Sequence, residues 1–291
     1  MYEASRHRAY TGTFVVSSSS ALSASRIWHI CDGTQQVERV ETLTGAPRST
    51  IRHNSDVVTF VPDSKVAFVD KREALGMQPA FLQAPDNNLP DFYLVKEGRP
   101  ERVAGFLADV VEFQPRDKLR FGYRIWSEQK TGLIVKLQTL GEDGSVLEQV
   151  AFSELKLNAP IRMDRLKRMM SDTKGYDVHR LNLKKTSAEE EGWRLKEAVP
   201  GFSPMSCYTR AVDTEGGKPR APMQWVFSDG LASVSLFVEP FDASQHTAED
   251  SSVMGATHTL TRKVGEYWLT AMGEVPSITL RRFALALERI R

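Results

Sequence analysis

The residues that could carry catalysis are spread along the chain and match no known catalytic pattern. The sequence lacks a Gly-x-Ser-x-Gly nucleophile motif, a Walker loop, a Gly-x-Gly-x-x-Gly turn and a His-Glu-x-x-His metal motif. Residues 215–218 read Glu-Gly-Gly-Lys, but they lack the spacing and the following Ser or Thr of a phosphate loop, so we expect a loop tip there. We therefore predict a protein that is not an enzyme. Sites assembled from distant residues leave no motif, so an enzyme remains the alternative.

The histidines and cysteines are the candidate metal ligands by residue type. The histidines are His7, His29, His53, His179, His246 and His258. They do not pair at metal-ligand spacing, and His29 lies in a predicted strand, where we expect an ordinary hydrogen-bonded residue. Cys31 and Cys207 are far apart, and we expect two free thiols, although their even number also permits a bridge between domains. We predict no metal and no cofactor.

A basic segment between residues 162 and 185 is the largest charge feature. It contains Arg162, Arg165, Lys167, Arg168, Lys174, Arg180, Lys184 and Lys185. Such runs are usually solvated, and the alternative is contact with an acidic peptide or a lipid phosphate. For that contact we single out Arg165, Lys167 and Arg168. The whole chain has 38 basic and 37 acidic residues, so its net charge of +1 gives no general attraction for nucleic acid.

A third set of candidates is apolar, and it either forms the core or lines a cavity for a lipid chain. The candidate lipid-binding residues are Phe14, Trp28, Met77, Phe81, Leu82, Phe121, Tyr123 and Leu133. Five of them lie in predicted strands. The other three lie between residues 71 and 90, a long segment with several prolines that we interpret as a lid or, equally, as an apolar plug.

The elements that must position these residues are mostly strands. Six short β-branched or aromatic runs between residues 9 and 70 are separated by turn residues. Residues 102–157 then read as a long meander with short polar turns at 127–132 and 141–144. About nine or ten antiparallel strands result, and a sheet of that size curls or closes into a half-barrel. We predict a mostly β domain of this kind, with short helices, over residues 8–158.

The composition changes near residue 159, where we place a basic linker that extends to residue 191 and includes a short helix over residues 163–170. A smaller α+β domain is predicted for residues 192–291. Its signals are a hairpin around Ser228-Asp229-Gly230 and an amphipathic helix that starts at Pro276 and runs to the end. The chain has 291 residues, enough for two domains.

Export from the cytoplasm is left open by the composition. No apolar stretch approaches the about 20 residues that a membrane-spanning helix needs. The first residues lack the apolar core of a signal peptide, which fits either a cytosolic protein or the mature form of an exported one.

An ordered set of short motifs resembles the RseB/MucB family over nearly the whole chain. The motifs are Tyr10-x-Gly12-Thr13-Phe14, Ile27-Trp28-His29, residues 38–51, Tyr123-x-Ile125-Trp126, Thr131-Gly132-Leu133, Trp193, Pro200-Gly201-Phe202 and Phe227-Ser228-Asp229-Gly230-Leu231. None of them is a catalytic signature, so the specificity of the resemblance comes from their order.

The resemblance implies a periplasmic regulator of an envelope-stress sigma factor. Its first domain would be an open half-barrel similar to the lipoprotein carriers LolA and LolB, and a smaller domain would follow. The partner would be the periplasmic region of a membrane-anchored anti-sigma factor, RseA or MucA, which the bound protein shields from its first proteolytic cut. Lipid signals, including lipopolysaccharide, would release it.

The competing function is a lipid or lipoprotein carrier, and the second domain argues against it because a simple carrier does not need one.

We expect an acyl chain to bind between the concave sheet face and the segment 75–82, lowering affinity for the anti-sigma factor. Self-association and the surface that binds the partner stay open.

Overall fold

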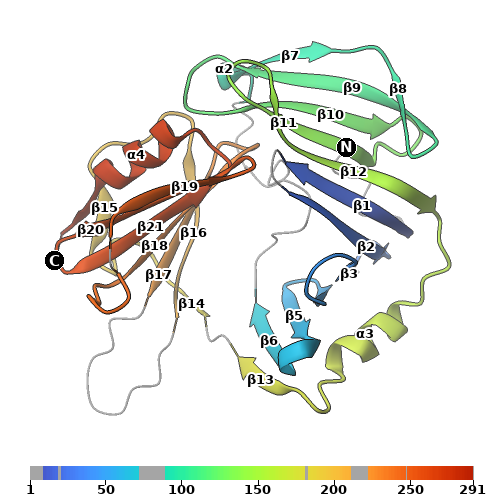
Figure 1. The fold of residues 1–291 in the computed structure, drawn as a ribbon, viewed down its shortest axis with the longest axis horizontal. Coiled ribbons are helices and arrows are strands. Elements are labelled where there is room, and N and C mark those ends of the chain that lie inside the picture. Colours follow the sequence, from blue (N-terminus) through green and yellow to red (C-terminus); the bar gives the residue numbers. More distant parts are fainter. Residues whose placement is uncertain are drawn as a thin grey trace. The chain divides into compact units, whose positions relative to one another are not determined.

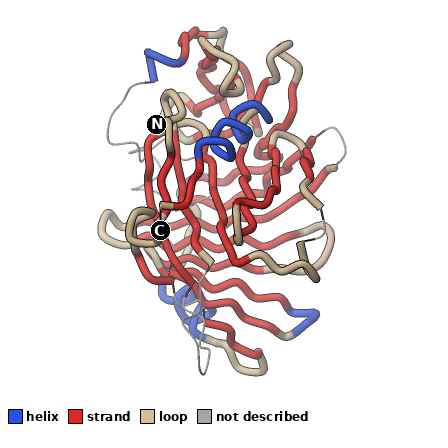
Figure 2. The backbone as a smooth tube through the Cα atoms, turned by 90° about the vertical axis from the view of Figure 1, so that its left-hand side faces the viewer, coloured by secondary structure: helices blue, strands red, loops and turns tan. Residues whose placement is uncertain are grey.

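Strands make up most of this protein, as Figures 1 and 2 show for the computed structural model. The structure describes residues 9–18, 21–71, 89–180, 183–210, 222–246 and 248–290. These residues form two compact units. The N-terminal unit contains the described residues up to 71, then 95–113 and 123–180. The C-terminal unit contains 89–94, 114–122 and the described residues from 183 onward.

The larger sheet has thirteen strands, twelve of them in the order β13-β6-β5-β4-β3-β2-β1-β12-β11-β10-β9-β7, with β8 paired to β9. Its strands are β1 (Tyr10–Ser18), β2 (Leu22–Cys31), β3 (Gln36–Thr42), β4 (Ser49–His53), β5 (Asp56–Val61), β6 (Val66–Lys71), β7 (Tyr93–Glu97), β8 (Glu101–Val103), β9 (Phe106–Pro115), β10 (Gly122–Glu128), β11 (Ile134–Leu140), β12 (Val146–Leu157) and β13 (Asp177–Arg180). The two ends of this order do not pair with each other, so the sheet is open. The predicted mostly β, open half-barrel is therefore confirmed.

Antiparallel neighbours joined by short turns account for most of this sheet. The turn after β10 shows why the sequence breaks there: the Glu128 carboxylate accepts hydrogen bonds from the backbone N–H groups of Lys130 (3.1 Å) and Thr131 (2.7 Å) and from the Thr131 hydroxyl. Gly132 follows with φ 68°, a left-handed conformation that favours glycine. The turn predicted at residues 127–132 is confirmed.

One long strand joins the two parts of the sheet. Strand β12 pairs with β11 on one side and with β1 on the other, so the meander continues directly into the N-terminal strands. Strand β13 pairs with β6 in parallel. Short helical segments are η1 (Pro62–Ser64), α2 (Leu89–Phe92) and α3 (Met163–Ser171). The helix predicted over residues 163–170 is thus present as α3.

The predicted linker, residues 159–191, contains ordered elements that pack on the N-terminal unit. Leu166 of α3 is 5% exposed and shares a core cluster with Val37, Ile51 and Phe60 of the sheet. The contact division places residues up to 180 with the N-terminal unit. The boundaries at 158 and 192 stay a prediction.

The C-terminal unit is built on a seven-stranded sheet in the order β14-β16-β17-β18-β21-β20-β19. Its elements are β14 (Leu183–Lys185), β15 (Trp193–Leu195), β16 (Ser203–Arg210), β17 (Met223–Ser228), β18 (Ser233–Pro240), β19 (Asp250–Met254), β20 (Thr257–Val264), β21 (Tyr267–Gly273), α4 (Ser277–Ala286) and β22 (Leu287–Arg289). The core cluster combines residues of β17, β18 and β21 with the buried residues of α4. The predicted hairpin at residues 228–230 is present between β17 and β18.

The C-terminal helix is shorter than predicted. It ends at Ala286, and Leu287–Arg289 instead form strand β22, paired with Trp193–Leu195. The apolar spacing of the sequence continues past residue 286, but pairing with a distant strand overrides helix propensity there. Among the described residues, no helix is long and apolar enough to cross a membrane.

Candidate functional site

Helix α3 positions one side of the candidate site in the N-terminal unit. It follows Pro160, and its apolar residues recur at the spacing of one helical face, so that Leu166 is buried against strands β3 to β6. Asp164 lies in the first turn and Arg168 in the last, the arrangement that the helix dipole favours. The helix therefore covers part of the curved sheet without closing over it.

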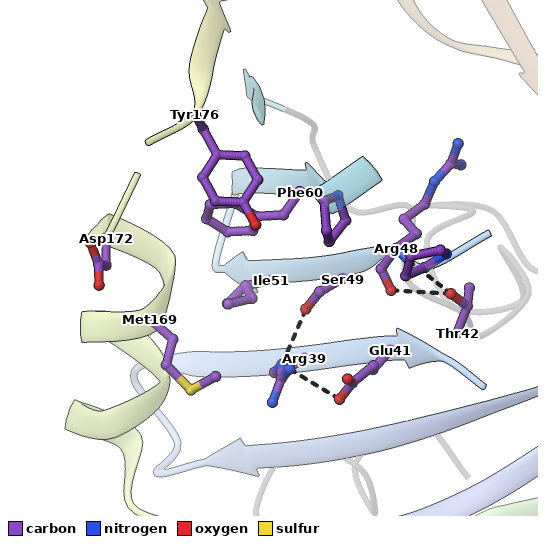
Figure 3. A pocket seen from close by; sticks show the side chains of 12 residues that line it. Arg39, Glu41, Thr42, Arg48, Ser49, Ile51, Phe60, Met169, Asp172 and Tyr176 are labelled. Carbon is purple, nitrogen blue, oxygen red and sulfur yellow. Dashed lines mark hydrogen bonds and ion pairs between the residues drawn. The ribbon is translucent and has the colours of Figure 1, made fainter. Parts of the chain in front are cut away.

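A pocket of about 310 Å³ lies between α3 and strands β3, β4 and β5 (Figure 3). Its apolar wall includes Ile51, Phe60 and Met169. The ring of Tyr176 meets Phe60 edge to face, with 5.1 Å between ring centres. We call this the Tyr176 pocket.

Arg39 and Arg48 both line that pocket, and three contacts fix the orientation of Arg39. Its Nη2 lies 3.0 Å from Glu41 Oε2, and its Nε donates a hydrogen bond to Ser49 Oγ at 3.1 Å (Figure 3). Its guanidinium carbon lies 4.9 Å from the ring centre of Trp28. Glu41 balances the charge of Arg39, and both side chains line the pocket.

A second pocket, of about 250 Å³, shares Arg39 and Met169 with the first. We call it the Trp28 pocket. It is lined by Trp28, Arg39, Pro160, Ile161, Arg162, Arg165, Leu166 and Met169. Two apolar spaces thus adjoin the same arginine and the same methionine, and arginines lie at their rims.

Chemically, the two pockets suit binding better than catalysis. Small-molecule sites are typically about 300–1,000 Å³, mostly apolar, with a few fixed polar groups. The Tyr176 pocket combines aliphatic and aromatic walls with Arg39, Arg48, Glu41 and Asp172. Within the described parts of the chain, no three His, Cys, Asp or Glu side chains are grouped so as to hold a metal.

Two residues singled out from the sequence meet in the Trp28 pocket. Trp28 was predicted to contact lipid and Arg165 to contact the partner or a lipid phosphate, and both line this space. Lys167 is half-buried and donates a hydrogen bond to Gln35, and Arg168 is exposed.

The other predicted lipid contacts do not join this site. Phe14 and Leu133 are buried in a separate core cluster of the same unit, and Tyr123 is 1% exposed. Phe121 belongs to the C-terminal unit, where it meets His258 edge to face at 5.5 Å. Met77, Phe81 and Leu82 lie outside the described residues.

Sequence reasoning missed the residues that line the Tyr176 pocket. Arg39 and Glu41 follow Val37 at intervals of two along β3, so one face of this strand carries both a core residue and a charged pair. Met169 follows Leu166 by three residues, which places both on one side of α3. The spacing of two was visible in the sequence, but nothing in it shows that α3 would lie across these strands.

A buried arginine in the C-terminal unit is the second polar site. The Arg120 side chain is 0% exposed, and its Nη1 donates to Asp229 Oδ2 at 3.1 Å. Its Nη2 donates to the Pro200 carbonyl at 2.7 Å, and its Nε to Asp117 Oδ1 at 3.1 Å. The guanidinium carbon also lies 4.4 Å from the ring centre of Phe92.

Asp229 is equally well satisfied. Its Oδ1 accepts from the backbone N–H groups of Leu231 (2.9 Å) and Ala232 (2.7 Å), and its Oδ2 also accepts from the Tyr93 hydroxyl at 2.9 Å. Burial raises the pKa of Asp229, and these hydrogen bonds and Arg120 oppose that rise. This buried pair joins residues 93, 117, 120, 200 and 229–232, so it anchors chain segments of the C-terminal unit to one another.

Comparison with known proteins places the chain in one family. The MucB/RseB N-terminal domain matches residues 1–170, and the MucB/RseB C-terminal domain matches residues 187–288. The sigma factor AlgU regulatory protein MucB of Pseudomonas aeruginosa is 27% identical over 292 aligned residues, covering 98% of this chain and 88% of that protein. The sigma-E factor regulatory protein RseB of Haemophilus influenzae is 25% identical and covers 94% of this chain and 84% of its own length.

Solved structures agree with this assignment. The structure of the Pseudomonas aeruginosa MucA/MucB complex superposes with a TM-score of 0.74 at 26% identity, over 100% of this chain and 96% of that one. MucB in complex with MucA(peri) gives a TM-score of 0.71 at 26% identity, over 99% and 96% of the two chains. Both family domains are matched in order along the sequence, and the family resemblance found in the motifs is confirmed: this chain belongs to the MucB/RseB family.

Proposed function

We propose that this protein is a regulator that binds the periplasmic region of a membrane-anchored anti-sigma factor of the MucA or RseA type. The observation that carries the proposal is similarity over the whole chain to MucB, whose solved structures include complexes with MucA. The bound protein would cover a segment of the anti-sigma factor and so block its first proteolytic cut. Its place would be the periplasm, and its role would not be enzymatic.

The test is a binding and protection experiment. The purified protein is mixed with the periplasmic domain of the anti-sigma factor from the same organism, and the complex is exposed to the site-one protease. We expect stoichiometric binding and a cleavage rate that falls as the protein is added. Absence of binding, or binding without protection, would refute the proposal.

Release by a lipid is the finer part of this proposal, and the groove beside α3 supports it. The Tyr176 and Trp28 pockets offer apolar walls next to Arg48 and Arg165, which suits an acyl chain with an anionic end. Each buried methylene contributes about 0.8 kcal/mol. A lipid shifts the equilibrium only if it binds the free protein better than the complex, because a ligand with equal affinity for both shifts nothing.

A space-filling substitution tests the lipid step. Met169 lines both pockets, so Met169→Trp should reduce the amount of lipid bound and raise the lipid concentration needed to release the partner. Ser171→Trp, at an exposed position of the same helix, is the control. Unchanged release in Met169→Trp would remove the groove from the mechanism.

A lipid or lipoprotein carrier is the second candidate function, favoured by the same apolar groove. The two are separated by mass spectrometry of lipids extracted from the purified protein, together with the binding experiment. Stoichiometric acyl lipid without affinity for the anti-sigma factor would support the carrier.

A further inference from the structure

The outward face of helix α4 carries two exposed aliphatic side chains. Ile278 is 47% exposed and Leu285 is 68% exposed, although the helix buries its other apolar residues in the core. Arg281 and Arg282 are exposed between them. These four residues stand at positions i, i+3, i+4 and i+7, so they lie on one side of the helix.

A small pocket adjoins this face. It has a volume of about 260 Å³ and is lined by Lys196, Glu197, Ala198, Val199, Arg282, Leu285 and Ala286. The backbone N–H of Lys196 donates to the Ala286 carbonyl at 2.8 Å, which holds residues 196–199 beside the end of the helix. Because the exposed side chain of Leu285 lines this pocket, we assign it to an aliphatic side chain of a partner.

The charges around the pocket favour an acidic partner. Glu288 already pairs with Arg194 (2.5 Å) and Lys196 (3.3 Å), and the hydrogen bond from Arg194 holds the pKa of Glu288 below its usual range. Within the described residues, Arg281 and Arg282 have no acidic side chain in hydrogen-bonding or ion-pair contact. Two cations are therefore available to a ligand.

From these observations we infer that this surface, Ile278, Arg281, Arg282, Leu285 and the adjoining pocket, binds an acidic, aliphatic peptide segment of the anti-sigma factor. The inference rests on the proposed function and names the surface that would perform it. Ile278 and Leu285 are seven positions apart, about 10.5 Å along the helix, and residues two and four apart on one face of an extended peptide are about 7 and 13 Å apart, so two aliphatic residues on one face of the partner bracket this spacing. Acidic residues between them would meet the arginines.

A membrane surface fits the same face less well. Binding to an anionic bilayer needs a large apolar face with cations around it. Here only two aliphatic side chains protrude from a helix of ten residues, and the exposed carboxylate of Glu197 lies at the pocket. A side-chain-sized pocket also contributes nothing to contact with a lipid surface.

The experiment measures the dissociation constant for the periplasmic domain of the anti-sigma factor from the same organism. The variants are the double substitution Arg281→Glu with Arg282→Glu, and Leu285→Glu. Controls with matched exposure are Lys156→Glu on β12 and Leu22→Glu, since Leu22 is 70% exposed on β2. Urea unfolding checks that all four variants are folded.

We expect each α4 variant to weaken binding at least about tenfold and each control to change it less than about twofold. Lysines in place of acidic residues in the partner segment should restore binding to the double variant. A photo-crosslinking residue at position 285 should capture the partner, and the same residue at position 22 should not.

The outcomes separate the two proposals. If the wild-type protein does not bind the partner, the proposed function fails. If the wild type binds and the α4 variants bind equally well, the proposed function stands and the inferred surface is wrong. If phosphatidylglycerol vesicles bind the wild type but not the double variant, and partner affinity is unchanged, the face is a membrane contact and the inference is overturned.

Discussion

Substitution of Arg120 by Met should destabilise the C-terminal unit strongly. The arginine is fully buried and donates to Asp229, Asp117 and the Pro200 carbonyl, so its removal leaves the Asp229 carboxylate buried without its cation. Breaking a buried ion pair on one side costs about 3–5 kcal/mol. Met keeps most of the apolar stem, so the loss should come from the charge and the hydrogen bonds. At about 4 °C per kcal/mol for a unit of this size, the thermal midpoint should fall by about 15 °C.

The assay is urea unfolding followed by pulse labelling of Cys207, which lies in the core of the same unit and reports its opening. Arg194→Met is the matched control in the same unit, because Arg194 pairs with Glu288 at 2.5 Å but its side chain is 60% exposed. Such a surface pair contributes little to stability. In the Arg120→Met background, Asp229→Asn should recover part of the loss, since it removes the uncompensated charge and keeps an oxygen for the backbone N–H groups. Equal, small losses in Arg120→Met and Arg194→Met would refute this reasoning.

Three further predictions concern single residues. Burial raises the pKa of the Cys207 thiol to about 12. At pH 8 a maleimide should therefore label only the half-buried Cys31 in the native protein, and both thiols in urea. Labelling of Cys207 in the native protein would contradict this prediction. Burial lowers the pKa of His258 below 6.5, so near and below that pH the unfolded chain binds more protons than the folded one. The C-terminal unit should therefore lose stability as the pH falls from 7.5 to 5.5. His258→Gln should reduce that loss, and an unchanged pH dependence would exclude His258 as its source. A Cβ at Gly12 would lie 2.5 Å from the Glu154 carbonyl oxygen and 2.8 Å from the Phe152 ring. Gly12→Ala should therefore lower the free energy of unfolding, measured in urea titrations, by about 1–3 kcal/mol. A change below about 0.5 kcal/mol would show that β12 can shift away from the added methyl group at little cost.

Local patterns in the sequence were enough to predict the elements and the class of fold. Period-two alternation and turn residues identified the meander and the hairpin at residues 228–230, because side-chain direction in a strand depends only on neighbouring positions. Helix α3 was predicted for the same kind of reason. The end of α4 was not, because β22 forms by pairing with Trp193–Leu195, almost a hundred residues away.

The sequence by itself determined that this is a two-part, mostly β protein of the MucB/RseB family, because the ordered motifs and the period of its apolar residues can be read without a structure. Only the tertiary structure decided which candidate binding residues lie together. Trp28 and Arg165 line one pocket together with Arg39 and Met169, whereas Phe14 and Leu133 belong to a separate core cluster. It also decided that Arg120, from the middle of the chain, is neutralised by Asp229 in the C-terminal unit. The physical reason is that burial and charge pairing depend on distances between residues far apart in sequence, and local propensities carry no information about those distances.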